Sequence, residues 1–224
     1  MIITIDGPVA SGKSSVAQQL AQCLGFYYLN TGLLYRAVAY VVAQQQPAKA
    51  AGNGCQLEPA DLTFVDDLIY TYHDGKAAIG FNGQDLTPRL YQAELDRQAS
   101  IISAQPAVRA ALLTLQRAIA QSHDVVADGR DCGTVVFPQA AVKFYLTADA
   151  QTRAKRLMQG DRRYAGMDLA QVVAAVQERD QRDQTRPIAP LKVPQDAVVI
   201  DSSSMAIDAV VERMMQVVKK PLKV

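Results

Sequence analysis

The sequence is poor in the residues that disulfide scaffolds, membrane spans and polyanion-binding proteins require. Three cysteines in 224 residues, with no C-x-x-C spacing, argue against a disulfide framework or a zinc site and indicate a reducing cytosol. No apolar run approaches the roughly 18 residues of a membrane span. A net charge of +1 gives no general attraction to nucleic acid or a membrane surface. No basic segment followed by an apolar stretch stands near Met1, so we expect a cytoplasmic protein.

A phosphate-binding loop follows the first apolar run of the chain. Residues 7–14 match the pattern G-x-x-x-x-G-K-[ST], after an expected buried strand at Ile2–Ile5. A helix is predicted from Lys13 to Leu24, and its N-terminus adds positive partial charge beneath the phosphates. The residues expected to contact nucleotide phosphates are Gly7, Pro8, Val9, Ala10, Ser11, Gly12, Lys13, Ser14 and Ser15.

Short apolar segments alternate with helical periodicity along most of the chain. Strands are predicted at Phe26–Leu29, Val125–Ala127, Val142–Leu146 and Ala197–Ile200. Helices are predicted at Leu33–Ala43, with Thr31 as the cap, and from Pro106 to about Ala120. Such alternation is typical of an α/β protein whose parallel sheet is covered by helices on both faces.

The span from Gln44 to about Arg89 departs from this alternation. Its predicted elements are antiparallel strands at Leu68–His73, at Lys76–Phe81 and near Leu86. Asp74-Gly75 and Asn82-Gly83 provide the turns between them. We interpret the span as an insertion into the parallel sheet.

Features outside the loop separate the protein classes that share it. A GTPase should carry Asn-Lys-x-Asp to recognise guanine, and no asparagine of this chain precedes a lysine. A motor ATPase usually ends its second acidic strand in Asp-Glu, where the glutamate activates water. Here Gly129 and Arg130 follow Asp128, which is placed to hold the hydration shell of Mg²⁺. The missing glutamate favours phosphoryl transfer to an acceptor over hydrolysis.

Three stretches resemble the bacterial cytidylate kinase family. They are residues 3–8 (ITIDGP), 31–36 (TGLLYR) and 127–134 (ADGRDCGT). Residues 178–180, 183–186, 189–191 and 196–201 follow in the family's order and spacing, so the resemblance covers nearly the whole chain. It implies one three-layer α/β P-loop kinase domain over residues 1–224 with a five-stranded parallel sheet. It also implies a lid near 151–167 and a nucleoside-monophosphate-binding insertion at 58–100.

The activity implied by the resemblance is transfer of the γ-phosphoryl group of ATP to CMP or dCMP, with Mg²⁺, by a monomer. The second pKa of a nucleotide phosphate is about 6, so the acceptor oxygen is already anionic at pH 7 and needs no general base. The reaction needs two anions held in line, with their repulsion offset by cations. Arginine suits this task because its planar guanidinium bridges two phosphate oxygens.

The family's functional positions can be carried over to this sequence. The resemblance assigns catalytic roles to Lys13, Arg130, Arg153, Arg156 and Arg179. It assigns the CMP site to Thr31, Tyr35, Arg36, Ser100, Arg109, Arg130, Asp131, Arg179, Asp183 and Arg186. Within that site, Ser100 and Arg109 are expected at the cytosine edge and Asp183 at the ribose. Ser14 and Asp128 are expected to hold Mg²⁺, and the lid is expected to carry Arg153, Lys155, Arg156, Arg162 and Arg163.

Simpler interpretations compete with these assignments. Arg179 and Asp183 also fit an ordinary ion pair on a helix surface, the basic stretch fits a solvated helix, and Tyr35 fits a core position. Asp6 fits a residue that ties down the phosphate loop through backbone hydrogen bonds. At the level of function, a kinase of UMP, shikimate or a nucleoside and a nucleotide-binding regulator stay open.

Three residues depart from the family's pattern. Asn30 stands where many members carry aspartate, Cys132 replaces a larger aliphatic residue, and Gln184 takes a place often held by serine or arginine. None of them lies in the phosphate loop or replaces one of the arginines. They therefore bear on efficiency and not on the class of reaction.

Overall fold

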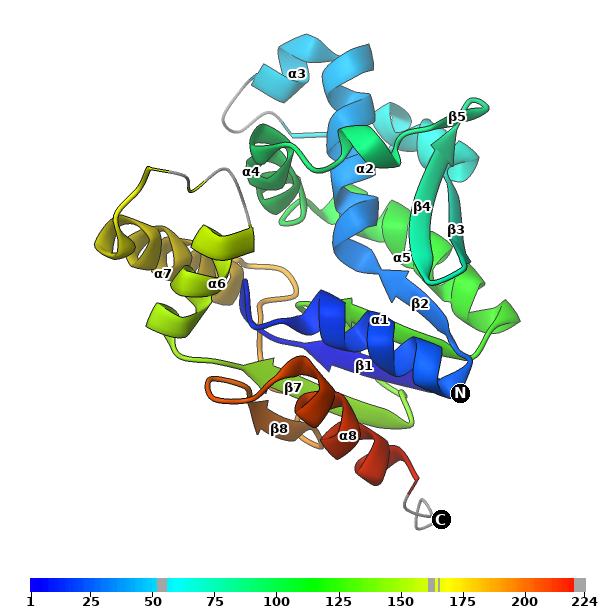
Figure 1. Cartoon of the computed structure of the whole chain (residues 1–224). Coiled ribbons are helices and arrows are strands. Elements are labelled where there is room, and N and C mark those ends of the chain that lie inside the picture. Colours follow the sequence, from blue (N-terminus) through cyan, green and yellow to red (C-terminus); the bar gives the residue numbers. More distant parts are fainter. Residues whose placement is uncertain (52–55, 161–163, 165, 220–224) are drawn as a thin grey trace. The chain divides into compact units, whose positions relative to one another are not determined.

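The computed structural model describes residues 1–51, 56–160, 164 and 166–219, and its elements are labelled in Figure 1. The chain divides into two compact units. The first unit comprises Met1–Tyr27 and Asp124–Val224, and the second comprises Tyr28–His123. The expected insertion at 58–100 falls within the second unit, and most of the expected lid falls on described residues of the first.

A five-stranded sheet has the strand order β2-β6-β1-β7-β8. These strands are β1 (Ile2–Asp6), β2 (Tyr27–Asn30), β6 (Val125–Gly129), β7 (Val142–Thr147) and β8 (Val198–Asp201). The central strand β1 pairs in parallel with β6 and β7, and β7 pairs in parallel with β8. Every residue of β6 is buried, as expected of a strand inside a sheet covered on both faces. The predicted α/β class and parallel sheet are confirmed.

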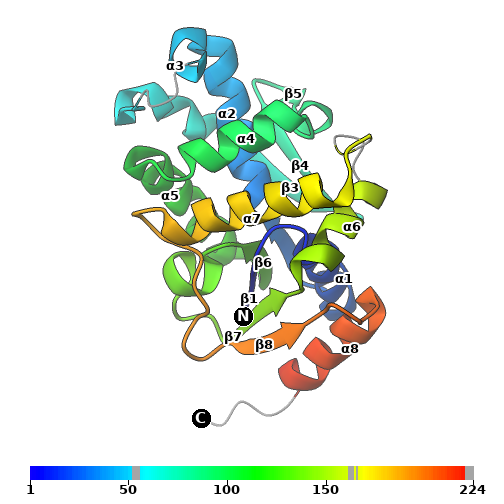
Figure 2. The same cartoon turned by 90° about the vertical axis from the view of Figure 1, so that its left-hand side faces the viewer.

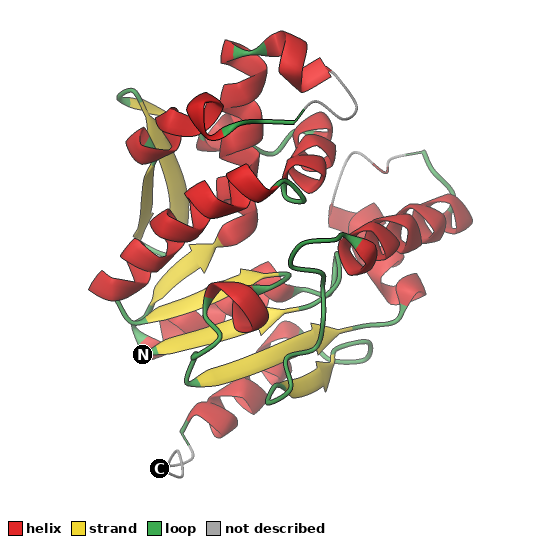
Figure 3. Cartoon of the chain, turned by 180° about the vertical axis from the view of Figure 1, so that it is seen from behind, coloured by secondary structure: helices red, strands yellow, loops and turns green. Residues whose placement is uncertain are grey.

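Four helices of the first unit accompany this sheet. They are α1 (Lys13–Leu24), α6 (Ala150–Gly160), α7 (Leu169–Thr185) and α8 (Ile207–Val218). Helix α1 packs beside α8, and α6 packs beside α7, as Figures 1 and 2 show. Figure 3 presents the strands from the opposite side, together with the short helical turn η3 (Cys132–Val136), which contacts β1. Because parallel strands end at one edge of a sheet, the segments after β1, β6, β7 and β8 lie at the same edge.

The second unit combines helices with a small antiparallel sheet. Its helical elements are α2 (Thr31–Gln45), α3 (Pro47–Ala51), η1 (Pro59–Asp67), η2 (Thr87–Arg89), α4 (Ala93–Ile102) and α5 (Pro106–Ser122). The sheet has the order β3-β4-β5, formed by β3 (Ile69–His73), β4 (Lys76–Phe81) and β5 (Gln84–Asp85). Asp74-Gly75 and Asn82-Gly83 all have positive φ angles of 49–74°, which matches the predicted turns. The predicted antiparallel strands are confirmed, and α2 packs against α4 and α5.

The start of α2 differs from the prediction. Thr31 is the first helical residue, and the cap is Asn30, whose side-chain oxygen accepts a hydrogen bond from the Leu33 amide at 3.0 Å. The predicted capping role of Thr31 is therefore wrong by one residue, because asparagine is at least as good a cap as threonine. None of the helices within the described part of the chain has the length and hydropathy of a membrane span.

Candidate active site

The phosphate loop joins β1 to α1 and requires glycine at its first position. Gly7 has a φ of 152°, and a β-carbon there would lie 2.0 Å from the Leu146 carbonyl oxygen of β7. Gly12, the residue before α1, has a φ of 92°, which also favours glycine. Between them Ala10 adopts a φ of 57°, an unusual conformation for a residue with a side chain. The loop thus lies in close contact with β7. Its backbone adopts a conformation that the intrinsic φ preferences of its residues do not favour.

Lys13, the first residue of α1, is folded back on the loop. Its Nζ atom donates to the Pro8 carbonyl oxygen at 2.6 Å and to the Ser11 hydroxyl at 3.3 Å. The residue is only 5% exposed. Burial and the nearby positive charge of Arg130 hold the pKa of Lys13 well below its usual value, although Asp128 opposes them. A phosphate brought to this ammonium would restore the lost solvation and favour the charged form.

The two residues expected at the metal lie in contact. The Ser14 hydroxyl donates to Oδ2 of Asp128 at 2.8 Å, so a hydroxyl and a carboxylate converge where α1 begins and β6 ends. Hard oxygen ligands of this kind suit Mg²⁺, which keeps several waters and takes few ligands from protein. The donor set therefore fits Mg²⁺.

Two arginines of α6 contact the backbone of the phosphate loop. Arg153 donates to the carbonyl oxygens of Val9 at 3.1 Å and Ala148 at 2.9 Å. Arg156 donates to the Ser11 carbonyl at 3.3 Å and to the carbonyl of Ser202 at 2.6 Å. The side chain of Arg153 is only 7% exposed, so the alternative of a solvated basic helix is wrong for this residue. Arg162 and Arg163 lie outside the described residues.

Helix α7 carries an acidic residue that pairs with the arginine after β6. Asp183 accepts a hydrogen bond from Nε of Arg130 at 2.8 Å, and its side chain is 7% exposed. Burial acts to raise the pKa of Asp183, but the charges of Arg130, Arg179 and Arg186 outweigh it and hold the pKa below its usual value. The alternative of an exposed pair on a solvated helix face is therefore wrong for Asp183.

A second buried ion pair lies beside the first. Nη2 of Arg186 is 2.9 Å from Oδ1 of Asp131, and both side chains are 7% exposed. Arg186 follows the last residue of α7, and its Nε donates to the Ala189 carbonyl at 2.7 Å. The structure thus brings together five of the predicted acceptor-site residues: Arg130, Asp131, Arg179, Asp183 and Arg186.

Asp6, the last residue of β1, anchors the turn that follows β6. Its two carboxylate oxygens accept hydrogen bonds from the Cys132 amide at 2.8 Å and the Gly133 amide at 2.7 Å. The expected backbone hydrogen bonds are present, but they hold the segment after Asp131 and not the phosphate loop. Burial raises the pKa of Asp6 to about 6, although the two amides act to lower it.

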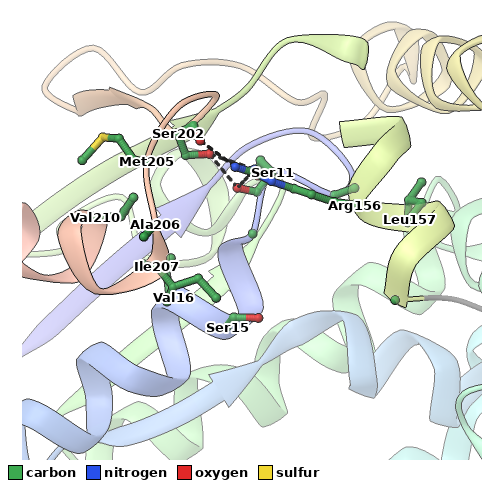
Figure 4. Close-up of a pocket in the computed structure, with 13 residues that line it drawn as sticks. Ser11, Ser15, Val16, Arg156, Leu157, Ser202, Met205, Ala206, Ile207 and Val210 are labelled. Atoms are coloured by element: carbon green, nitrogen blue, oxygen red, sulfur yellow. Dashed lines mark hydrogen bonds between the residues drawn. The ribbon is translucent and has the colours of Figure 1, made fainter. Parts of the chain in front are cut away.

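A pocket of about 480 Å³ lies directly beside the phosphate loop, as Figure 4 shows. One wall is the loop itself at Ala10, Ser11 and Gly12, and another is Arg156 and Leu157 of α6. The segment between β8 and α8 provides the apolar side chain of Met205, and α8 itself provides Ile207 and Val210. Its size and largely apolar lining are typical of a site for a small-molecule ligand.

In the second unit, α2 carries three of the predicted acceptor-site residues. Thr31 and Tyr35 are both buried and lie one helical turn apart, as predicted. Nε of Arg36 is 2.5 Å from Oδ1 of Asp96 in α4, and its guanidinium lies 5.7 Å from the centre of the Tyr91 ring. The guanidinium of Arg36 is therefore held by a carboxylate and an aromatic face.

The two residues expected at the cytosine edge are linked through Ser103. Nη1 of Arg109 donates to the Ser103 carbonyl at 3.1 Å, and the Ser103 hydroxyl donates to the Ser100 carbonyl at 2.8 Å. The guanidinium carbon of Arg109 lies 5.8 Å from the centre of the Tyr35 ring. The structure thus brings Tyr35, Ser100 and Arg109 together, and the buried Arg109 has few accessible orientations.

Sequence reasoning missed two residues that hold the phosphate loop in place. Ser202 follows β8, and its hydroxyl contacts the carbonyl oxygens of Ser11 and Thr147 at 3.1 Å each. Asp180 of α7 forms an ion pair with Arg153 at 2.6 Å. Both had a signal in the sequence, because Ser202 stands at the carboxyl end of a predicted strand and Asp180 precedes Asp183 by one helical turn.

Known proteins resemble this chain over nearly its whole length. A family model described as cytidylate kinase matches residues 3–220. The protein named cytidylate kinase from Bdellovibrio bacteriovorus is 39% identical, with 99% of each chain covered. That from Syntrophotalea carbinolica is 40% identical, with 97% of this chain and 92% of that protein covered. A crystal structure of an uncharacterized protein from Eubacterium ventriosum has a TM-score of 0.56 at 14% identity, covers 98% of this chain and 99% of its own, and supports the fold alone.

Proposed function

The chain belongs to the cytidylate kinase family, and from this premise we propose that it transfers the γ-phosphoryl group of ATP to CMP or dCMP, giving ADP and CDP or dCDP. One observation carries the proposal beyond the family name. Within the first unit, Lys13 of the phosphate loop lies close enough to Arg130 and Asp183 for the charges of both residues to act on its ammonium group. The resemblance assigns Arg130 and Asp183 to the acceptor. Cations for two phosphate groups are therefore assembled together.

The reaction requires that the two phosphate groups be positioned in line, and it does not require a general base. An anionic phosphate oxygen of CMP attacks the γ-phosphorus of ATP, and the bond from that phosphorus to the bridging oxygen of ADP breaks. Lys13 and Arg130 offset the negative charge shared between the attacking and leaving oxygens. Arg179 and Arg186 stand near Asp183 and reduce the repulsion between the two nucleotides. Because the acceptor oxygen is already anionic, the reaction needs no catalytic base.

Mg²⁺ is the proposed cofactor, held with ATP by Ser14 and Asp128. When bound, the ion supplies positive charge to the phosphate oxygens of ATP. Asp128 accepts the hydrogen bond from Ser14 and thereby fixes the direction of the hydroxyl. The carboxylate of Asp128 and the Ser14 hydroxyl would bind the ion directly or through its water molecules.

The adenine of ATP is proposed to occupy the pocket beside the loop. Leu157, Met205 and Ile207 offer apolar contacts there, and Arg156 lines the pocket and donates to the Ser11 carbonyl of the loop. Closure of α6 and the residues after it as a lid over ATP is part of the proposal, because closure would exclude water from the reacting phosphates.

The second unit is proposed to bind CMP and select its base. Arg36 would contact the acceptor phosphate, Thr31 and Tyr35 would border the site, and Ser100 and Arg109 would meet the cytosine edge. A wrong base would leave buried polar groups without partners, which is how a hydrogen-bonding site discriminates. We also propose that the protein is a monomer that acts in the cytosol, in pyrimidine nucleotide metabolism. The monomer and the metabolic role follow from the family, and the cytosol follows from the cysteine usage.

The test is identification of the products. The protein is incubated with ATP, Mg²⁺ and CMP, and the nucleotides are separated by ion-exchange chromatography. We expect ADP and CDP in equal amounts, and neither when CMP is omitted. If ADP forms with shikimate or UMP but not with CMP or dCMP, the protein is a kinase of that other acceptor. If the protein binds ATP but forms no ADP with any acceptor, it is a nucleotide-binding regulator.

A further inference from the structure

Asp180 lies on the face of α7 that also carries Asp183. The two residues are three positions apart in the helix, so they lie on the same side one turn from each other. Asp183 contacts Arg130 of the proposed acceptor site, whereas Asp180 is directed at the phosphate loop. The side chain of Asp180 is 13% exposed, and burying a carboxylate is costly unless it is paired and hydrogen-bonded.

The partners of Asp180 come from two other elements. Oδ2 is 2.6 Å from Nη1 of Arg153 in α6, and Oδ1 accepts from the Val9 amide of the phosphate loop at 3.4 Å. The same Nη1 atom of Arg153 donates to the Val9 carbonyl at 3.1 Å. Both polar groups of Val9 are thus contacted by one ion pair, which joins the loop to α6 and α7.

The loop needs external support at this point. Ala10, the residue after Val9, holds a φ of 57°, which an alanine does not adopt without compensating contacts. The carbonyls of Pro8, Val9 and Ser11 accept from Lys13, Arg153 and Arg156, respectively. Three cationic side chains therefore fix the peptide orientations on which phosphate binding by the loop depends.

We infer that Asp180 is a positioning residue for phosphoryl transfer, which holds the Arg153 guanidinium against Val9 and so maintains the conformation of the phosphate loop. Asp180 acts through Arg153 and Val9 and need not touch either nucleotide. Without its charge, Arg153 is no longer held against Val9 and is released to other anions, including the phosphates of ATP. The loop then samples conformations in which its amides no longer converge on a phosphate.

The inference rests on the proposed function and predicts an effect confined to ATP. Asp180→Asn keeps the size of the side chain and removes the charge that holds Arg153. We expect KM for ATP to rise about tenfold and kcat to fall severalfold, since small misplacements of a binding group have effects of this order. KM for CMP should stay within twofold, because Arg130 and Asp183 keep their contact.

The control is Glu178→Gln, which removes the same charge from the same helix. Glu178 is 75% exposed and faces Arg182 at 3.9 Å, so its loss should leave both KM values unchanged. Asp180→Glu keeps the charge and should recover part of the lost ATP affinity. In a double-mutant cycle, Asp180→Asn should have little further effect once Arg153→Met has been introduced.

A merely structural role predicts a different pattern. Loss of packing between α6 and α7 would lower the melting temperature and the active fraction but leave KM for ATP unchanged in the folded protein. A wild-type KM for ATP in Asp180→Asn, or equal rises in KM for ATP and CMP, would overturn the inference. If Asp180→Asn does not fold, Arg153→Met takes its place, and a wild-type KM for ATP in that variant is the overturning result.

Calorimetric titration with Mg²⁺ and ADP separates this inference from the proposed function. ADP binding needs the phosphate loop but no acceptor, so weaker binding to Asp180→Asn than to Glu178→Gln supports the positioning role even if wild-type protein fails to phosphorylate CMP. If wild-type protein phosphorylates CMP and the two variants bind ADP equally well, the proposed function stands and Asp180 has no positioning role.

Discussion

The two units of the chain differ in their ion pairs: among the described residues, exposed pairs occur in both units, but the most buried pairs lie in the first. In the first unit, the pairs of Arg153 with Asp180 and Arg186 with Asp131 have side chains no more than 13% exposed. In the second unit, Arg97 pairs with Glu94 at more than 50% exposure of both side chains, and Arg36 is 22% exposed. Arg109, the buried arginine of the second unit, is held by a carbonyl and an aromatic ring.

This difference matches the tasks proposed for the two units. Transfer between two phosphates requires cations that are already in place, because rearranging charges during the reaction would add to the barrier. Buried ion pairs keep the cations in place before the reaction begins. Recognition of a base requires instead a donor whose direction is fixed, and a guanidinium held by the Ser103 carbonyl and the Tyr35 ring has one. The first unit should therefore determine rate for every acceptor, and the second should determine which acceptor is used.

The largest expected effect comes from Lys13→Met in the first unit. Loss of the ammonium that neutralises the transferred group should lower kcat by about 10³-fold, in the range seen when one preorganised group is removed. The loss should be equal for CMP and UMP. Steady-state assays with both acceptors measure it, with Lys219→Met, at an exposed position after α8, as the control that stays at wild-type rate. A change in the ratio of CMP to UMP turnover would contradict the proposed division of tasks, in which the first unit sets the rate and the second unit selects the acceptor.

Arg109→Met in the second unit should act on selection. We expect the ratio of kcat/KM for CMP to that for UMP to fall by up to about 100-fold, because a hydrogen-bonding site loses discrimination with its donor. The residual rate with UMP should change little. Arg117→Met, at an exposed position of the same helix, is the matched control. An equal loss with both acceptors would show that Arg109 serves the reaction and not the choice of base.

Asp6 provides a prediction about pH and stability in the first unit. Its pKa is raised to about 6, so the folded protein holds a proton that the unfolded chain releases above pH 4. This residue's contribution to the free energy of unfolding therefore falls between pH 4 and pH 6, by up to about 3 kcal/mol. Asp6→Asn removes the effect. Urea unfolding at pH 4 and pH 7 should show the wild-type protein losing about 2 kcal/mol relative to the variant; a constant difference would contradict the raised pKa.

The smallest effect is expected at the start of α2 in the second unit. Asn30→Ala removes the cap bond to Leu33 and should lower the free energy of unfolding by about 1 kcal/mol. Asn30→Asp keeps the bond and adds negative charge at a helix N-terminus, which should raise stability by about 0.5 kcal/mol. Thermal unfolding of both variants measures the difference. Equal melting temperatures for the wild-type protein and Asn30→Ala would remove Asn30 as the cap.

The sequence was informative where chain-local patterns are strong. The phosphate loop, its strand and its helix were predicted because Gly7, Gly12 and Lys13 stand at fixed spacing between two clear periodicities. The turns at Asp74-Gly75 and Asn82-Gly83 were predicted for the same reason, since few other dipeptides accept two positive φ angles. The placement of Arg130 and Asp183 was expected only through resemblance to a family.

The remaining features depend on contacts between distant segments. Asp180 meets Val9 across 171 positions of sequence, and Ser202 meets Ser11 across 191. The spacing of one helical turn places Asp180 on the face of Asp183 and so separates it from the exposed Glu178, but it does not identify Val9 and Arg153 as its partners. Likewise, Asn30 and Thr31 are both good caps, so the sequence alone does not decide between them.

The decisive measurement is kcat/KM for CMP and for UMP in the wild-type protein, Lys13→Met and Arg109→Met under one set of conditions. If the first unit performs transfer and the second selects the base, Lys13→Met loses activity with an unchanged CMP to UMP ratio, and Arg109→Met loses the ratio while keeping turnover with UMP. A uniform loss in both variants, or a wild-type protein with no preference for CMP, would contradict that division.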